Sequence, residues 1–193
     1  MPSIAAFNDA RSYHIVTYGT LLGSTAFQTF LAGPIAFKAL SRPAFSQLQQ
    51  AIFPNFFALQ TVLPLVLAFT WPGDRVAGAE DVVGSPVLLR RNAGWKGLLD
   101  SVNLWQASVP IGIMFATAFL NLMLLGPMTT KVLRERKHQE TRDSKRYYDP
   151  GPHSDAMQGL NNSFMWMHGA SSSANLIAFF AMIYYGASLA ERL

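Results

Sequence analysis

Residues 101–130 read SVNLWQASVPIGIMFATAFLNLMLLGPMTT and contain no Asp, Glu, Lys or Arg. Three further stretches share this property: residues 12–37, 43–73 and 156–190. A helix needs roughly 20 mostly apolar residues to cross the hydrocarbon core of a bilayer. It also satisfies its own backbone hydrogen bonds, as lipid requires. The sequence therefore predicts an all-α fold, an integral membrane four-helix bundle.

The 193 residues leave room for one such domain. Half of them are hydrophobic and 13% are charged, whereas a soluble domain has about 25% charged residues. We place an N-terminal tail at residues 1–12, a four-span domain at 13–190, and the spans at about 13–37, 51–71, 104–128 and 164–189. Good helix formers follow the third span, so it is predicted to continue as a helical cytosolic extension into a basic loop, residues 131–160.

Lys and Arg predict the orientation of the spans. The loops after the first and third spans hold more of these residues than the termini and the central loop do. We therefore expect both loops in the cytosol and both termini on the opposite side. A basic run beside a span is expected to contact anionic lipid headgroups rather than nucleic acid. The four residues predicted to do so are Lys131, Arg134, Arg136 and Lys137.

Polar side chains within a span call for a role. Four of them share one face of the fourth span, at i, i+3, i+4 and i+7: His168, Ser171, Ser172 and Asn175. Gly19 and Gly23 form a G-x-x-x-G step in the first span, where small residues let helix backbones approach closely. The first interpretation is interhelical packing with hydrogen bonds; the alternative is a substrate or ion path along the polar face.

No catalytic residue, metal or other cofactor is predicted. His14 and His168 begin spans one and four at opposite membrane faces, on the order of 25–30 Å apart, so they cannot share a metal or haem. The spans contain no carboxylate, and the chain has no cysteine to form a disulfide or bind a metal as thiolate.

The remaining motifs lie near the cytosolic ends of the spans. They are Phe53-Pro54-x-x-Phe57, Asn121-x-x-x-Leu125-Gly126-Pro127-x-Thr129-Thr130 and His168-Gly169-x-Ser171-Ser172-x-x-Asn175-Leu176. In this order, and with four spans, the chain resembles the transmembrane protein 205-like family over roughly residues 13–187. The resemblance implies a small multi-pass protein with no established enzymatic activity, associated with vesicular trafficking and drug export. The predicted polar cluster comprises Asn121, Gly126, Pro127, Thr129, Thr130, His168, Gly169, Ser171, Ser172 and Asn175.

Three functions follow as hypotheses. The first is a non-enzymatic trafficking or scaffold component that binds the bilayer and other membrane proteins, or forms homo-oligomers. The second is a small oligomeric transporter or pore that uses the polar face of span four. The third is a membrane enzyme acting on a lipophilic substrate, with His168 as its acid–base group. The endomembrane system or plasma membrane is favoured over mitochondria. Residues 85–100 fit either a helix in the headgroup plane or an exposed loop.

Overall fold

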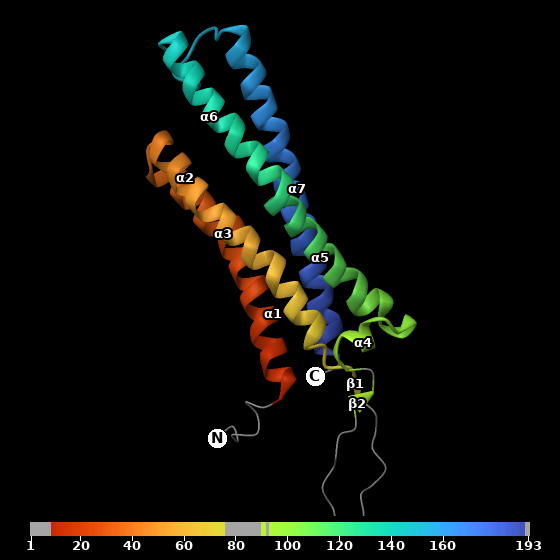
Figure 1. Ribbon diagram of the computed structural model, residues 1–193. Helices are drawn as coiled ribbons and strands as arrows, with labels where there is room; N and C mark the ends of the chain where they lie inside the picture. Colours follow the sequence, from red (N-terminus) through yellow and green to blue (C-terminus); the bar gives the residue numbers. More distant parts are fainter. Residues whose placement is uncertain (1–8, 76–89, 92, 192–193) are drawn as a thin grey trace, which may run out of the picture.

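The computed structural model describes residues 9–75, 90–91 and 93–191, and almost all of these are helical (Figure 1). The elements in chain order are α1 (Ala10–Ala26), η2 (Phe27–Ala32), α2 (Gly33–Ala39), α3 (Arg42–Phe69), β1 (Asp74–Arg75), β2 (Arg90–Arg91), α4 (Gly94–Leu98), η3 (Ser101–Asn103), η4 (Leu104–Ser108), α5 (Val109–Leu120), η5 (Asn121–Leu125), α6 (Gly126–Asp143) and α7 (Asp155–Ala190). Several of these join without a break, so the chain forms four long helices.

Three of the four are long and apolar enough to cross a membrane: Arg42–Phe69, Ser101–Asp143 and Asp155–Ala190. The first helix, residues 10–39, is not among them, because Thr, Ser and Gln side chains interrupt its apolar run. It nevertheless packs through α1 against α3 and α7 as the fourth member of the bundle. The all-α membrane bundle is confirmed, and so is the helical extension after the third span.

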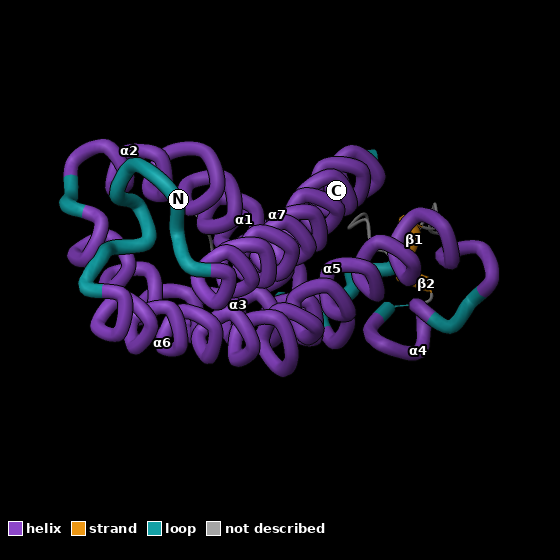
Figure 2. The backbone as a smooth tube through the Cα atoms, turned by 90° about the horizontal axis from the view of Figure 1, so that it is seen from above, coloured by secondary structure: helices purple, strands orange, loops and turns teal. Residues whose placement is uncertain are grey.

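The four helices alternate in direction. α1 begins and α7 ends at the end of the molecule that also carries α4 and the strands (Figure 1). The α2–α3 and α6–α7 connections lie at the opposite end, and the α6–α7 hairpin projects furthest there. Seen from above, α4, β1 and β2 lie at one side of an elongated bundle (Figure 2). The number of membrane crossings stays a prediction, because three of these four helices are long and apolar enough to cross a membrane.

All four helices begin before the predicted spans, and two of them, α3 and α7, begin nine residues earlier. α3 starts at Arg42, so most of the expected connection between spans one and two is helical. Its first turn contains Pro43, which is preset for a helix start, and Pro54 consequently lies in the helix interior rather than in the first turn. α7 starts at Asp155 because the Ser154 side chain caps it, accepting a hydrogen bond from Met157 N at 3.2 Å.

Three π-helical turns have one sequence feature in common. η2, η4 and η5 each end two residues before a proline: Pro34, Pro110 and Pro127 respectively. Proline has no backbone N–H and its ring collides with the carbonyl four residues earlier, so an extra residue in the preceding turn relieves the conflict. The Gly-Pro pairs at 33–34 and 126–127 therefore widen the helix locally instead of ending it.

The turn at the second of these pairs requires a glycine at position 126. Its N–H donates to the Asn121 carbonyl, and a Cβ at Gly126 would lie 2.8 Å from that oxygen. Only a glycine fits this turn without displacing the backbone.

A central apolar core joins α1, α3, α5 and α7. Leu21, Leu67, Met114 and Met182 are its innermost side chains. At one end of the bundle, β1 pairs with β2 antiparallel, with Asp74 opposite Arg91. In the predicted interfacial segment, residues 85–89 and 92 lie outside the described residues, and the described part contains β2 and the short helix α4.

Candidate functional site

A polar network connects three helices inside the bundle. The Gln60 Nε2 group donates to Thr25 Oγ1 at 2.9 Å and to Asn175 Oδ1 at 2.9 Å. Asn175 Nδ2 in turn donates to Thr29 Oγ1 at 2.9 Å. Gln60 itself is only 2% exposed. The four side chains therefore hold α1 and its π-helical turn, α3 and α7 together through directional bonds. We call this group the polar layer.

Exposed aromatic residues on α7 indicate the depth of the polar layer. Trp166 and Tyr184 are 76% and 52% exposed, and aromatic side chains of this kind gather at the two membrane surfaces. They are separated by about 27 Å along the helix, close to the roughly 30 Å thickness of the hydrocarbon core. Asn175 lies midway between them. The polar layer is therefore near the bilayer midplane.

Asn121 makes a second contact with α7. This side chain is buried at the start of η5, and its Nδ2 donates to the Ser171 carbonyl at 3.4 Å. Its Oδ1 atom is buried without a hydrogen-bond partner in the described part of the chain. Ser171 lies one turn before Asn175 on α7, so Asn121 is placed beside the polar layer, at the entry to a π-helical turn.

The structure does not bring the other predicted cluster residues together. His168 is exposed and stacks on Phe164 of its own helix, with ring centroids 5.6 Å apart. Pro127, Gly169 and Ser172 are also exposed. Thr129 donates to the Leu125 carbonyl within its own helix at 2.6 Å, and Thr130 is half-buried. The single cytosolic cluster is replaced by a network at mid-membrane depth, because the inward face of α7 carries Ser171 and Asn175 but not His168.

Gly19 and Gly23 make no close helix contact within the chain. Both are exposed, and a Cβ at either position would meet no atom within 4 Å. The close approach between α1 and α7 occurs instead at Gly186, where a Cβ would overlap the Tyr18 hydroxyl. Tyr18 donates to the Met182 carbonyl at 3.0 Å, which fixes its ring against α7.

A second buried group, which we call the histidine cluster, lies where α1 begins and α3 and α7 end. His14 is fully buried; its Nδ1 lies 2.9 Å from Thr70 Oγ1 and its Nε2 lies 2.6 Å from the Tyr185 hydroxyl. Trp71 packs against both rings. Thr70 already donates to the Val66 carbonyl, so it accepts from Nδ1 and Tyr185 donates to Nε2. The imidazole proton is thereby assigned to Nδ1.

Basic residues of the α6–α7 hairpin divide into two sets. Lys131, Arg134 and Lys137 are exposed, as contact with lipid headgroups requires. Arg136 is only 6% exposed and stacks on the rings of Tyr147 and Phe164, at 3.8 and 4.7 Å. Burial lowers the pKa of Arg136, opposed by Tyr147 and Glu140. Arg136 therefore joins α6 to α7 rather than facing lipid.

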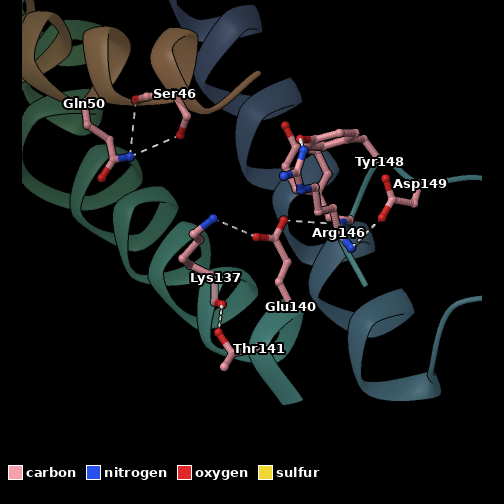
Figure 3. Close-up of polar contacts among 9 residues, drawn as sticks. Ser46, Gln50, Lys137, Glu140, Thr141, Arg146, Tyr148 and Asp149 are labelled. Atoms are coloured by element: carbon pink, nitrogen blue, oxygen red, sulfur yellow. Dashed lines mark hydrogen bonds and ion pairs between the residues drawn. The ribbon is translucent and has the colours of Figure 1, made fainter. Parts of the chain in front are cut away.

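Polar contacts also order the tip of the hairpin (Figure 3). Lys137 Nζ donates to Glu140 Oε2 at 3.0 Å, and the Arg146 amide donates to Asp149 Oδ2 at 2.8 Å. The turn after α6 is thus a defined structure carrying exposed charge. Ser144 supports it by adopting a φ of 48° at the helix end.

The histidine cluster was not predicted, and Gln60 was predicted only as a polar side chain within the second span, not as a partner of Asn175. The sequence nevertheless contains an indication of each group. Three residues of the histidine cluster lie at span ends on one predicted side of the membrane: His14, Trp71 and Tyr185. Three residues of the polar layer lie at the centres of their spans: Thr25, Gln60 and Asn175. In chemical terms the two groups fix helices to one another. Within the described residues, no three His, Cys, Asp or Glu side chains gather in a way that could hold a metal ion.

Replacing Gln60 by Leu is expected to lower the free energy of unfolding by about 1–2 kcal/mol, because Asn175 and Thr25 lose a partner in lipid. Asn175→Leu should cost a similar amount, and the double variant should cost less than the sum of the two. Titration with sodium dodecyl sulfate in mixed micelles measures all three. Asn55→Leu is the control: Asn55 is exposed on α3 and bonds only within its helix. Strict additivity would contradict the direct Gln60–Asn175 bond.

A helical bundle of apolar spans with its polar side chains bonded inside defines the class: a multi-pass membrane protein. Residues 16–138 match a family described as a domain of unknown function, DUF4149. The match covers more than half of the chain, so the protein belongs to this family. It is also 27% identical, over 94% of this chain and 89% of the relative, to the xanthocillin biosynthesis cluster protein D of Aspergillus fumigatus. No solved structure matches it.

Proposed function

We propose that this protein is a non-enzymatic scaffold or trafficking component of a membrane. Its bundle would hold the α6–α7 hairpin at the cytosolic surface, where other membrane proteins, a second copy of the chain or anionic lipids bind it. The observation that supports this most is the internal pairing in the polar layer. Gln60, Asn175, Thr25 and Thr29 bond to one another, so these groups serve to join helices rather than to contact a passing solute.

The hairpin is the part of the molecule suited to binding. Lys131, Arg134 and Lys137 present positive charge along α6, and a positive surface next to a span attracts anionic lipids or acidic segments of a partner. The Arg136 stack and the bonded turn keep this surface rigid. A rigid charged surface loses little conformational freedom on binding.

The relatives suggest a setting for this role. The resemblance to the transmembrane protein 205-like family favours trafficking or export. The name of the Aspergillus relative places that protein in a biosynthesis cluster for xanthocillin. By analogy, the protein described here would serve a small-molecule pathway at an endomembrane or plasma membrane.

Transport is the second candidate, and one observation favours it. Asn121 has a buried side-chain carbonyl oxygen for which residues 9–75, 90–91 and 93–191 supply no partner, beside the polar layer and at a π-helical turn. Such turns are frequent at functional sites, and a polar solute moving along α7 would find an acceptor there.

The natural absence of cysteine allows the two candidates to be separated. Single cysteines at Ser171, Ser172 and Asn175, with Arg134→Cys as the hairpin reference, are tested in sealed vesicles with a membrane-impermeant thiol reagent. The scaffold proposal expects labelling at position 134 from one side only and protection at the three α7 positions. Labelling at positions 171, 172 and 175 would instead establish an aqueous path and favour the transporter.

A further inference from the structure

An apolar groove of about 420 Å³ lies between the third and fourth long helices. One wall is formed by Trp105, Val109 and Ile113, which follow one another at intervals of four residues on η4 and α5. The facing wall includes Ile177 and Tyr184 on α7, with Ala181 between them. The small Ala181 side chain leaves the hollow between these two larger neighbours.

The groove extends across part of one leaflet. Tyr184 and Trp105 are both exposed at its mouth, at the membrane surface that Tyr184 defines on α7. Ile177, at the inner end, lies two residues from Asn175 of the polar layer. The distance from Tyr184 to Ile177 along the helix is about 10 Å. The hollow therefore runs from the headgroup level toward the midplane and ends beside the polar layer.

We propose that this groove binds one acyl chain of a membrane phospholipid, from the leaflet on the side where α1 begins and α7 ends. The chemistry of the lining suits both the acyl chain and the ester or headgroup region of a phospholipid. The lining between the two ends is apolar and includes Pro110 and Phe180 as well as the aliphatic side chains. Trp105 and Tyr184 line one end, and their indole N–H and hydroxyl groups are donors for which a headgroup or glycerol ester offers acceptors.

The groove is a hollow between two helices, α5 and α7, that pack directly on each other. An occupant has to fit between the side chains of the two walls, and an α-helix with its own side chains is about 10 Å wide. A single hydrocarbon chain is much narrower, and it enters sideways from the surrounding lipid without opening the bundle.

The test uses the full chain in phosphatidylcholine vesicles containing a photoactivatable phosphatidylcholine, with the diazirine either near the ester or deep in the acyl chain. Cross-linked residues are mapped by mass spectrometry. The shallow probe should favour Trp105 and Tyr184, and the deep probe Ile113 and Ile177, several-fold over exposed positions of the same helices outside the groove, such as Phe119 and Leu176.

Filling the groove provides the matched comparison. Ile177→Trp should lower cross-linking at Ile113 several-fold, whereas Leu176→Trp, a neighbouring exposed position outside the groove, should leave it unchanged. Ala181→Leu fills the same space from a second position on the α7 wall, and unfolding in detergent verifies that each variant is folded. Equal cross-linking around the whole bundle, no dependence on probe depth, or links to a second protein chain instead of lipid would each overturn the proposal.

Discussion

Tyr185→Ala is expected to lower the free energy of unfolding by about 3–5 kcal/mol, a loss typical of a deleted buried aromatic ring. Tyr185 is fully buried, and its ring packs against His14, Tyr18 and Trp71 with centroids 5.7–6.1 Å apart. Removing it opens a cavity and leaves the His14 Nε2 atom without its donor. Titration with sodium dodecyl sulfate, followed by the fluorescence of nearby Trp71, measures the change.

The neighbouring residue is the control for this experiment. Tyr184 has the same side chain one position earlier but faces lipid, so Tyr184→Ala should change stability by no more than about 0.5 kcal/mol. Tyr185→Phe isolates the hydroxyl and should cost about 1–3 kcal/mol, because an unpaired nitrogen stays buried. Similar losses for Tyr184→Ala and Tyr185→Ala would contradict the histidine cluster.

Gly186→Ala is the second change expected to destabilise the protein strongly. Alanine at the other glycines of α7 is expected to stabilise it instead. A Cβ at position 186 would overlap the Tyr18 hydroxyl and lie 2.8 Å from Tyr18 Cζ. Tyr18 is held by its bond to the Met182 carbonyl, so either the Tyr18 side chain rotates and loses this bond or α1 moves away. Overpacking of this kind costs about 1–3 kcal/mol, measurable as a lower unfolding midpoint in detergent.

Gly169→Ala is the matched change on the same helix. Nothing lies within 4 Å of a Cβ there, and replacing a helical glycine by alanine stabilises by about 0.5–1 kcal/mol. Moving Gly186→Ala into a Tyr18→Ala background should remove most of its cost, because the overlapping atoms are absent. A full cost in that background would place the conflict elsewhere.

The general fold could be predicted from the sequence because long uncharged stretches are typical of membrane-spanning helices. The rotation of each helix about its own axis, which decides which side chains face inward, could not be predicted. Gln60 and Asn175 were placed at the centres of their spans, yet only the packed structure shows that they face each other. His168 illustrates the same limit from the other direction: a helix face that holds four polar residues directs only part of its width inward.

Arg136 escaped prediction for a different reason. Its burial depends on Tyr147, which lies beyond the turn, and on Phe164 in the next helix. A basic run read along the chain gives no sign that one member is enclosed by aromatic rings brought back by a hairpin. The π-helical turns could have been anticipated only in part, because a proline indicates a disturbed helix without specifying how the disturbance is absorbed.

The last helix completes the bonds of several buried polar groups, and this has a consequence for biogenesis. His14, Gln60 and Asn121 each have a partner on α7, up to 171 residues away along the chain. During synthesis the earlier helices can form the His14–Thr70 and Gln60–Thr25 bonds, but the bonds to α7 form only after the C-terminal segment leaves the ribosome. A chain that stops short of α7 would leave the Asn121 amide and the His14 Nε2 atom without these partners in lipid, the kind of defect that marks a nascent membrane protein for degradation.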